Sequence, residues 1–191
     1  MTDPPSEREI AERAQGHAHQ PLTPAEYEAL MHFRAQWAEL VTNAGTRFFV
    51  LGSFADADVD RVNDLKSTIN DFSADCVAYR MDDFLEDIDL NLNSILKFKL
   101  IADGSDYILG VCEHDKGGQL IEHGLLIESR SYIQKARLLK RTYPPDLEKQ
   151  RYSWMQSLGV FEIFDYYGQL YEWETVPEYQ SLVEGLVDDL V

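Results

Sequence analysis

Basic residues are scarce in this sequence. Its 191 residues include 17 Lys and Arg against 34 Asp and Glu, which gives a formal net charge of −17. A protein that holds nucleic acid needs a basic face to meet the phosphates, so this composition argues against a nucleic-acid partner. The acids are spread along the chain, which is typical of a salt-adapted, haloarchaeal-type protein. We expect exposed acids on helix faces at positions such as Asp82, Asp83, Glu86, Asp87 and Asp89.

Cysteines and long apolar runs are scarce as well. The two cysteines, Cys76 and Cys112, each lie in an apolar stretch, which predicts buried free thiols and does not indicate a disulfide framework. No apolar run approaches the ~20 residues of a membrane span, and residues 1–15 lack a signal-peptide core. We therefore expect a soluble, cytoplasmic protein without a membrane partner. A hydrophobic content of 45% is enough for one domain with a real core.

The N-terminal part is predicted to be an arm followed by a helix. Residues 1–20 are polar and interrupted by Pro4 and Pro5, which indicates a loose arm with at most one short helix. Thr23 and Glu26 then have the spacing of a capping box, and apolar residues follow at helical spacing until Gly45. We predict an N-terminal extension over residues 1–45 and an α/β domain over residues 46–191.

Strand and helix patterns alternate after residue 45. The predicted strands are 47–54, 75–81, 106–112 and 135–141, with late strands at 159–164 and 169–173. The predicted helices are 58–72, 90–102, 118–126 and 146–158, with an amphipathic helix from 176 to 190. This alternation predicts an α/β fold with a mostly parallel sheet and helices on both faces. Ligands of such folds bind beyond the carboxyl ends of the strands. Three strand-end loops should therefore converge on one crevice: residues 52–54, 112–118 and 140–142.

The stretch VCEHDKGGQLIEHG, residues 111–124, holds two acid–histidine pairs. His114 and His123 lie nine residues apart, which is not the spacing that places two zinc ligands on one helical face, so two exposed polar side chains are favoured over a metal site. The run from Asp56 to Asp60 is not a calcium loop, because Arg61 stands where that loop needs glycine. Nucleotide-triphosphate and nucleophile-elbow motifs are also missing.

Glu122 follows the Gly-Gly turn and lies near the start of the predicted helix. A helix N-terminus stabilises an anion, so the carboxylate there would suit a nucleophile or a partner for a developing positive charge. The alternative is that Glu122 has no functional role and only stabilises the start of the helix, where acids are favourable in any protein. The residues alone leave both readings open.

The order of elements resembles the nucleoside 2-deoxyribosyltransferase-like family and its TIR-like relatives over about residues 47–130. GSF follows the first strand, and SDYILGV leads to GQLIEHG. Asp106 matches the family's aspartate before the strand, and Gly118, Glu122 and Gly124 match its glycine–glutamate–glycine helix start. Gln119, His123 and the missing proline between Ser53 and Phe54 depart from the pattern.

The resemblance implies a flavodoxin-like (TIR-like) domain that binds a nucleotide or nucleoside and cleaves or transfers at an N-glycosidic bond. Glu122 would be the catalytic carboxylate, no cofactor is expected, and NAD is a candidate substrate. The implied substrate-binding residues are a cradle of Gly52, Ser53, Phe54, Gly117 and Gly118, with Glu113 or Asp115 for a ribose hydroxyl and Lys140 or Arg141 for a phosphate. The rival hypothesis is a non-catalytic ligand-binding or protein-interaction module.

The region beyond residue 130 matches no motif of that family. Aromatic residues cluster there, and such clusters more often form a core or an interface than a platform for bases. We predict packing or contacts between copies in a homo-oligomer for this set: Tyr152, Trp154, Phe161, Phe164, Tyr166, Tyr167, Tyr171 and Trp173.

Overall fold

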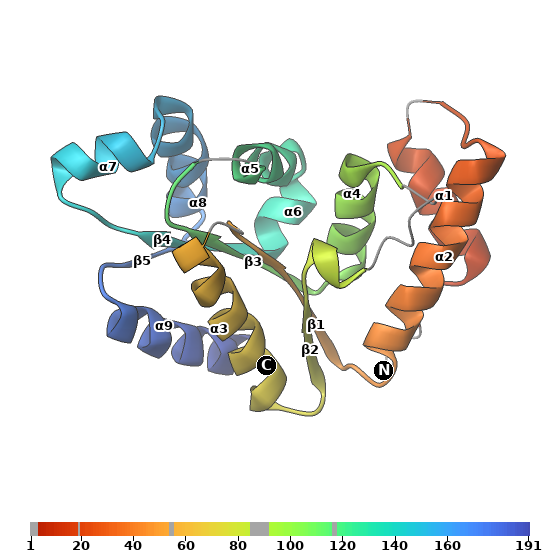
Figure 1. The fold of residues 1–191 in the computed structure, drawn as a ribbon, viewed down its shortest axis with the longest axis horizontal. Coiled ribbons are helices and arrows are strands. Elements are labelled where there is room, and N and C mark those ends of the chain that lie inside the picture. Colours follow the sequence, from red (N-terminus) through yellow and green to blue (C-terminus); the bar gives the residue numbers. More distant parts are fainter. Residues whose placement is uncertain (1–3, 19, 54–55, 85–91, 116–117) are drawn as a thin grey trace.

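The protein forms one five-stranded, all-parallel sheet between two layers of helices (Figure 1). The computed structural model describes residues 4–18, 20–53, 56–84, 92–115 and 118–191. The strands are β1 (Thr46–Leu51), β2 (Cys76–Tyr79), β3 (Tyr107–Cys112), β4 (Ala136–Arg141) and β5 (Leu170–Trp173). Their order in the sheet is β2-β1-β3-β4-β5, which is the flavodoxin-like order. The predicted α/β fold class is therefore confirmed.

Two helices cover one face of the sheet, α3 (Asp56–Phe72) and α9 (Val176–Leu190). Alternate residues of the strands point to this side, among them Phe48 and Val50 of β1 and Leu109 of β3, because successive side chains of a strand face opposite sides. They pack with apolar residues of both helices, including Ile69 and Val183. The amphipathic pattern that predicted α9 thus corresponds to a buried stripe.

The other face is covered by the remaining crossover helices. These are α4 (Ser94–Gly104), α5 (Gln119–Glu128), α6 (Arg130–Lys135), a π-helical turn η2 (Gln156–Phe161) and α8 (Glu162–Tyr166). Phe49, Ile108 and Leu138 point to this side from three neighbouring strands. A short 3-10 turn, η1 (Met81–Asp83), follows β2, and α7 (Pro145–Arg151) follows β4 at the carboxyl edge.

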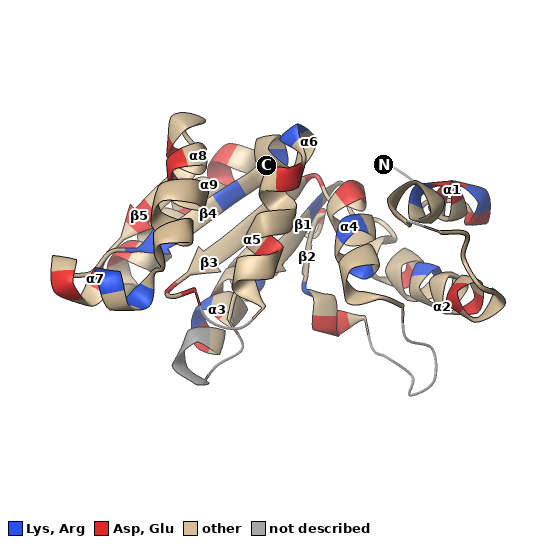
Figure 2. Cartoon of the chain, turned by 90° about the horizontal axis from the view of Figure 1, so that it is seen from above, with Lys and Arg blue, Asp and Glu red and all other residues tan. Residues whose placement is uncertain are grey.

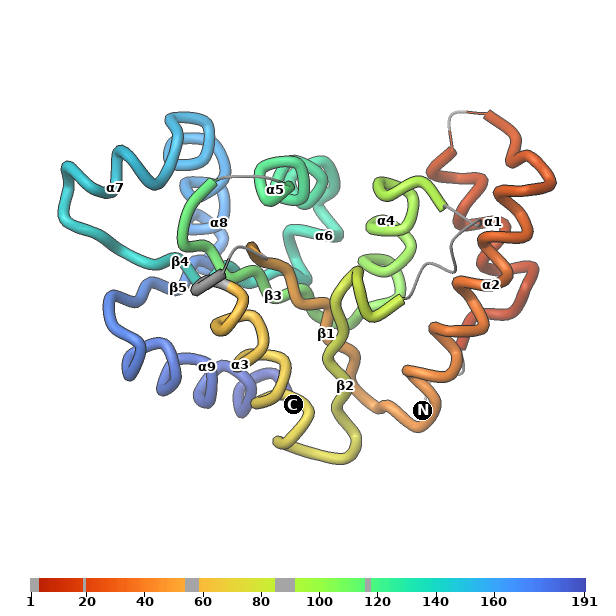
Figure 3. Tube along the Cα trace, viewed as in Figure 1, coloured from red at the N-terminus to blue at the C-terminus, as the bar shows by residue number. Residues whose placement is uncertain are grey.

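The N-terminal segment is part of the core. Helix α1 (Glu7–His17) and helix α2 (Pro24–Val41) both begin with a capping box, and that of α2 is the predicted pair of Thr23 and Glu26. Figure 3 shows the two helices side by side next to α4. Ile10 of α1 is fully buried and belongs to the same apolar cluster as Phe49 of β1. The single short helix was expected, but the expectation of a loose arm was wrong.

The region after β4 differs most from the prediction. Residues 159–164 are helical, within η2 and α8, and not a strand. Val160, Phe161 and Phe164 are buried at helical spacing, and a short apolar run alone cannot distinguish a strand from a buried helix. The predicted helix 146–158 is interrupted, because α7 ends at Arg151 and Tyr152 turns into the core. The late strand at 169–173 is confirmed as β5, whereas α6 was not predicted.

No helix in the described part of the chain is long and apolar enough to cross a membrane. Acidic residues occur on most of the helices (Figure 2). Of the acids expected to be exposed, Asp82 pairs with Arg80 at 2.6 Å and Asp83 pairs with Lys66 at 2.5 Å, and Asp83 is only partly exposed. The positions of Glu86, Asp87 and Asp89 lie outside the described residues.

Candidate functional site

The carboxyl ends of β1, β3 and β4 are neighbours, because these strands are adjacent in the sheet. The order of the strands reverses between β1 and β3, which is where ligands of flavodoxin-like folds bind. The loops predicted to converge do start from this edge. Gly52 follows β1, and a Cβ atom on it would lie 2.5 Å from the Val62 Cγ2 atom and 3.4 Å from the Val111 carbonyl oxygen. Packing against α3 and β3 therefore explains the glycine.

Glu113, at the end of β3, lies between two arginines. Its Oε1 atom is 3.4 Å from the Arg61 Nε atom, and its Oε2 atom is 3.6 Å from the Arg141 Nη1 atom. The Glu113 side chain is 5% exposed. The guanidinium of Arg141 also lies over the rings of Tyr143 and Trp173. Glu113 and Arg141, predicted to contact a sugar and a phosphate, are thus joined to each other and connect β3, β4 and α3.

Asp115 connects the loop after β3 to the end of α7 and the segment after it through two hydrogen bonds. Its Oδ2 atom accepts a hydrogen bond of 2.6 Å from the Ser153 backbone N–H, and its own N–H donates to the Arg151 carbonyl oxygen at 3.0 Å. The carboxylate satisfies a free N–H group where the next helical segment begins. This contact explains Asp115 without a sugar hydroxyl.

Lys140 is paired with acidic side chains of the protein itself. Its Nζ atom lies 2.7 Å from a carboxylate oxygen of Glu148 and 2.9 Å from one of Glu172, and its side chain is only 12% exposed. The rings of Tyr152 and Phe161 lie beside the same ammonium group. A phosphate at Lys140 would have to displace two carboxylates.

Glu122 lies in the first turn of α5 and lines a pocket of about 220 Å³ between α4 and α5. The other lining residues come from η1, α4 and the start of α5: Met81, Ser94, Ile95, Phe98, Gly118, Ile121 and Leu125. The Glu122 Oε2 atom is buried and has no hydrogen-bond partner among the residues that the structure describes. The carboxyl group therefore lies in mostly apolar surroundings.

Burial raises the pKa of Glu122 from its usual value of 4.5 to about 7. The sequence had suggested a carboxylate stabilised as an anion by the helix N-terminus, and this expectation was wrong. Burial, the cause of the raised pKa, favours the neutral form of the carboxyl group at this position. A carboxyl group with this pKa exchanges its proton near neutral pH, which suits a general acid or base.

Only part of the predicted constellation surrounds this pocket. Gly118 lines it together with Glu122, whereas Ser53 and Asp115 do not. Phe54 and Gly117 lie outside the described residues. The prediction that Glu122, Asp115 and Ser53 lie around one pocket stays a prediction, because residues 54–55 and 116–117 of the two loops lie outside the described residues. Asp115 itself contacts the segment after α7.

Both histidines of the stretch 111–124, His114 and His123, are buried. His123 is fully buried, and its Nδ1 atom lies 2.6 Å from the Gln156 Nε2 atom, while its Nε2 atom lies 3.6 Å from the Cys112 Sγ atom. Burial lowers the pKa of His123 to about 4, so the ring is neutral at pH 7. The prediction of two exposed histidines was wrong, while that of buried free thiols is confirmed. Helical spacing could have predicted the burial of His123, because Gln119, His123 and the apolar Leu126 share one face of α5.

Metal ligands do not gather around these histidines. In the described ranges, no group of three His, Cys, Asp or Glu side chains is arranged to hold a metal ion. The polar atoms under α5 bind one another or the backbone instead, as the Gln119 Nε2 atom does when it donates to the Val111 carbonyl oxygen at 2.7 Å.

Comparisons with known proteins identify the family and support the fold. No curated protein matches the sequence. The crystal structure of a conserved protein from Enterococcus faecalis V583 is similar, with a TM-score of 0.52 and 13% identity over 78% of this chain and 100% of that one. The flavodiiron protein from Giardia intestinalis has a TM-score of 0.41 and 12% identity over 86% of this chain and 39% of that one, which is too weak to support an argument. A family model described as "Family of unknown function (DUF8170)" matches residues 3–149, and the chain therefore belongs to this family.

Proposed function

We propose that the protein binds a nucleoside or nucleotide at the carboxyl edge of its sheet and cleaves or transfers at the N-glycosidic bond, with Glu122 as general acid. The proposal rests on one observation: a carboxyl group with a pKa of about 7 lines a pocket beside the switch in strand order. The resemblance of the GQLIEHG stretch to nucleoside deoxyribosyltransferase-like enzymes points to the same residue.

Proton transfer explains why a neutral carboxyl group would be useful here. When the bond between a base and the anomeric carbon breaks, electrons move onto the base nitrogen, and a proton donor stabilises the leaving group. Glu122 would supply that proton, and water or a second acceptor sugar would complete the bond at the anomeric carbon. The Glu122 carboxylate left by this step would then take a proton from the attacking hydroxyl group, which restores the neutral carboxyl group. The reaction needs no cofactor. NAD would be a substrate whose nicotinamide leaves as a neutral base without a proton, so ionised Glu122 would act there only as the base that takes the proton of the attacking hydroxyl group.

A second candidate function is non-catalytic binding, and one observation favours it. Glycosidases commonly use two carboxyl groups, but Glu122 is the only acidic residue among the described residues that line its pocket. Asp115 and Glu113 are the nearest acids that precede Glu122 in the sequence. Glu113 pairs with Arg61 and Arg141, and Asp115 accepts from the Ser153 N–H. A domain of this kind would bind the ligand without breaking it.

Base release distinguishes the two functions. The protein is incubated in molar KCl with NAD and a panel of nucleosides, and free base is measured by chromatography. We expect release by the wild type, a loss of release in Glu122→Gln, and full release in Glu184→Gln, which changes an exposed glutamate on α9. Release that is unchanged in Glu122→Gln removes Glu122 from the mechanism. Thermal stabilisation by a nucleoside without turnover identifies the binding module.

A further inference from the structure

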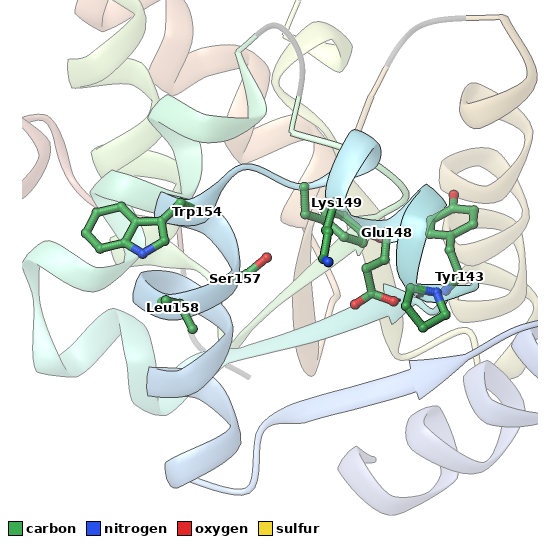
Figure 4. Close-up of a pocket in the computed structure, with 8 residues that line it drawn as sticks. Tyr143, Glu148, Lys149, Trp154, Ser157 and Leu158 are labelled. Atoms are coloured by element: carbon green, nitrogen blue, oxygen red, sulfur yellow. Dashed lines mark hydrogen bonds between the residues drawn. The ribbon is translucent and has the colours of Figure 1, made fainter.

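A second, larger pocket lies beyond the carboxyl end of β4 (Figure 4). It measures about 650 Å³, a size typical of small-molecule sites. The lining residues come from the loop after β4, from α7 and from the helical segment that follows: Tyr143, Pro145, Glu148, Lys149, Tyr152, Trp154, Ser157 and Leu158. Of these, only Lys149 and Glu148 carry charge. We call this space the Trp154 pocket.

The walls of the Trp154 pocket are apolar and its polar groups converge. In Figure 4, Trp154 and Leu158 lie on one side and Tyr143 on the other, and the polar ends of Ser157, Lys149 and Glu148 point into the space between them. An apolar cleft with a few convergent polar groups is the usual form of a ligand site.

Trp154 is exposed to an unusual degree. Its relative exposure is 71%, whereas the other two tryptophans, Trp37 and Trp173, are 1% and 2% exposed. Leu158, beside it in the pocket, is 53% exposed. A large indole face that is exposed to solvent in the free protein is available to stack against a flat ring.

The charges at the Trp154 pocket favour an anion. The Glu148 carboxylate is paired at 2.7 Å with the Lys140 ammonium group, which it shares with Glu172. Over the described part of the chain, neither Lys149 nor Arg151 has a carboxylate within ion-pair distance, and Arg151 lies over the ring of Tyr143. In the part of the chain that the structure describes, the positive charges of Lys149 and Arg151 are therefore not offset by a paired acid, although acids outnumber bases two to one in the sequence.

We propose that the Trp154 pocket binds a flat aromatic or heteroaromatic ring that carries an anionic group. The ring stacks on Trp154 and packs against Leu158, and the anionic group meets the ammonium of Lys149. Ser157 supplies a hydroxyl group to a ring nitrogen or a ring substituent. This site is separate from the pocket of Glu122 and does not depend on N-glycosidic chemistry.

Tryptophan fluorescence tests the proposal, because the solvent-exposed indole is that of Trp154 while Trp37 and Trp173 are buried. The probes are AMP and benzoate as aromatic anions, adenosine as the neutral aromatic compound, and ribose 5-phosphate as the anion without an aromatic ring. We expect AMP or benzoate to quench the fluorescence and to protect it from iodide, and ribose 5-phosphate to do neither. Quenching by benzoate alone identifies a carboxylate ligand, and quenching by AMP alone a phosphate ligand. Failure of both aromatic anions overturns the proposal.

Variants then separate the ring from the anion, with affinity measured by calorimetry. Trp154→Leu should weaken binding of the quenching probe by about tenfold, because stacking is lost. Lys149→Gln should weaken binding of that probe about threefold, because a single exposed ion pair is weak. The affinity for adenosine, which carries no anionic group, should not change. Met155→Leu and Arg13→Gln, which change an exposed neighbour of Trp154 and a distant exposed cation, should have no effect. An unchanged affinity in Trp154→Leu contradicts the proposed site.

The two pockets can be tested independently. Quenching at Trp154 that persists in Glu122→Gln, without any base release by the wild type, would remove the N-glycosidic proposal and leave this site intact. Base release that depends on Glu122, without quenching by either aromatic anion, would support the N-glycosidic proposal and remove the proposed site at Trp154.

Discussion

Replacing Glu122 by glutamine should change how the stability of the protein depends on pH. In the unfolded chain this carboxyl group ionises at about its usual pKa of 4.5, whereas in the folded protein it keeps its proton up to about 7. Its contribution to stability is therefore fully present below pH 4.5 and is lost as the pH rises to about 7. The difference between the two pKa values corresponds to about 3 kcal/mol.

His123 works in the opposite direction. Its pKa falls from the usual 6.5 to about 4 because it is buried, so its contribution is present above pH 6.5 and is lost as the pH falls to about 4. This change also corresponds to about 3 kcal/mol. Between pH 4.5 and 6.5, the two effects nearly cancel in the wild type. Glu122→Gln leaves the histidine effect alone, so the stability of the variant should rise with pH over this range.

Urea unfolding at a series of pH values measures the effect at constant high salt. The relevant quantity is the free energy of unfolding of Glu122→Gln minus that of the wild type, since all other groups cancel from it. We expect this difference to move by about 3 kcal/mol in favour of the variant between about pH 4.5 and about pH 7. The same difference for Glu184→Gln, on the exposed side of α9, should stay constant. A constant difference for Glu122→Gln would refute the burial of its carboxyl group.

Three further predictions concern stability. Tyr152→Phe removes a hydroxyl group that shares its single proton between the buried Cys112 carbonyl oxygen at 2.7 Å and the partly buried Arg141 carbonyl oxygen at 2.8 Å. The free energy of unfolding in urea should fall by about 1–3 kcal/mol, whereas Tyr166→Phe, at an 84% exposed residue, should not change it measurably. Gly52→Ala should lower the melting temperature, because the new Cβ atom would lie 2.5 Å from the Val62 Cγ2 atom, and Val62→Ala in the same chain should recover part of the loss; a neutral single variant would contradict the packing at β1. If the charge of −17 reflects salt adaptation, the melting temperature should be higher in molar KCl than in dilute buffer, because salt screens repulsion between acids; equal values would argue against adaptation.

Local signals in the sequence predicted the elements, while contacts between distant segments decided the site. The capping box of Thr23 and Glu26 depends only on residues three apart, and it is present as expected. The parallel sheet also followed from the alternation of short apolar runs with amphipathic stretches. The run at 159–164 was misassigned because a short apolar run does not distinguish a strand from a helix that is buried against another segment, here α5.

The chemistry of the site was harder to predict for the same reason. Glu122 was expected to be an anion from its place in α5, but its pKa depends on apolar neighbours such as Phe98 of α4. His123 appeared exposed because its partner Gln156 lies 33 residues away. Asp115 was assigned to a sugar, whereas it caps the segment at Ser153. Each of these outcomes depends on which segments meet in space, which the spacing of residues along the chain does not contain.

The position of Glu113 between Arg61 and Arg141 has a consequence for behaviour at high salt. Ions in solution weaken interactions between exposed charges, but they reach a buried pair poorly. The Glu113 side chain is 5% exposed. Molar salt screens the repulsion among the surface acids, but it should leave the attraction between Glu113 and the two arginines almost unchanged. Three elements, β3, β4 and α3, meet through this carboxylate. The carboxyl edge of the sheet should therefore keep its shape across a range of salt concentrations in which the interactions among exposed charges change.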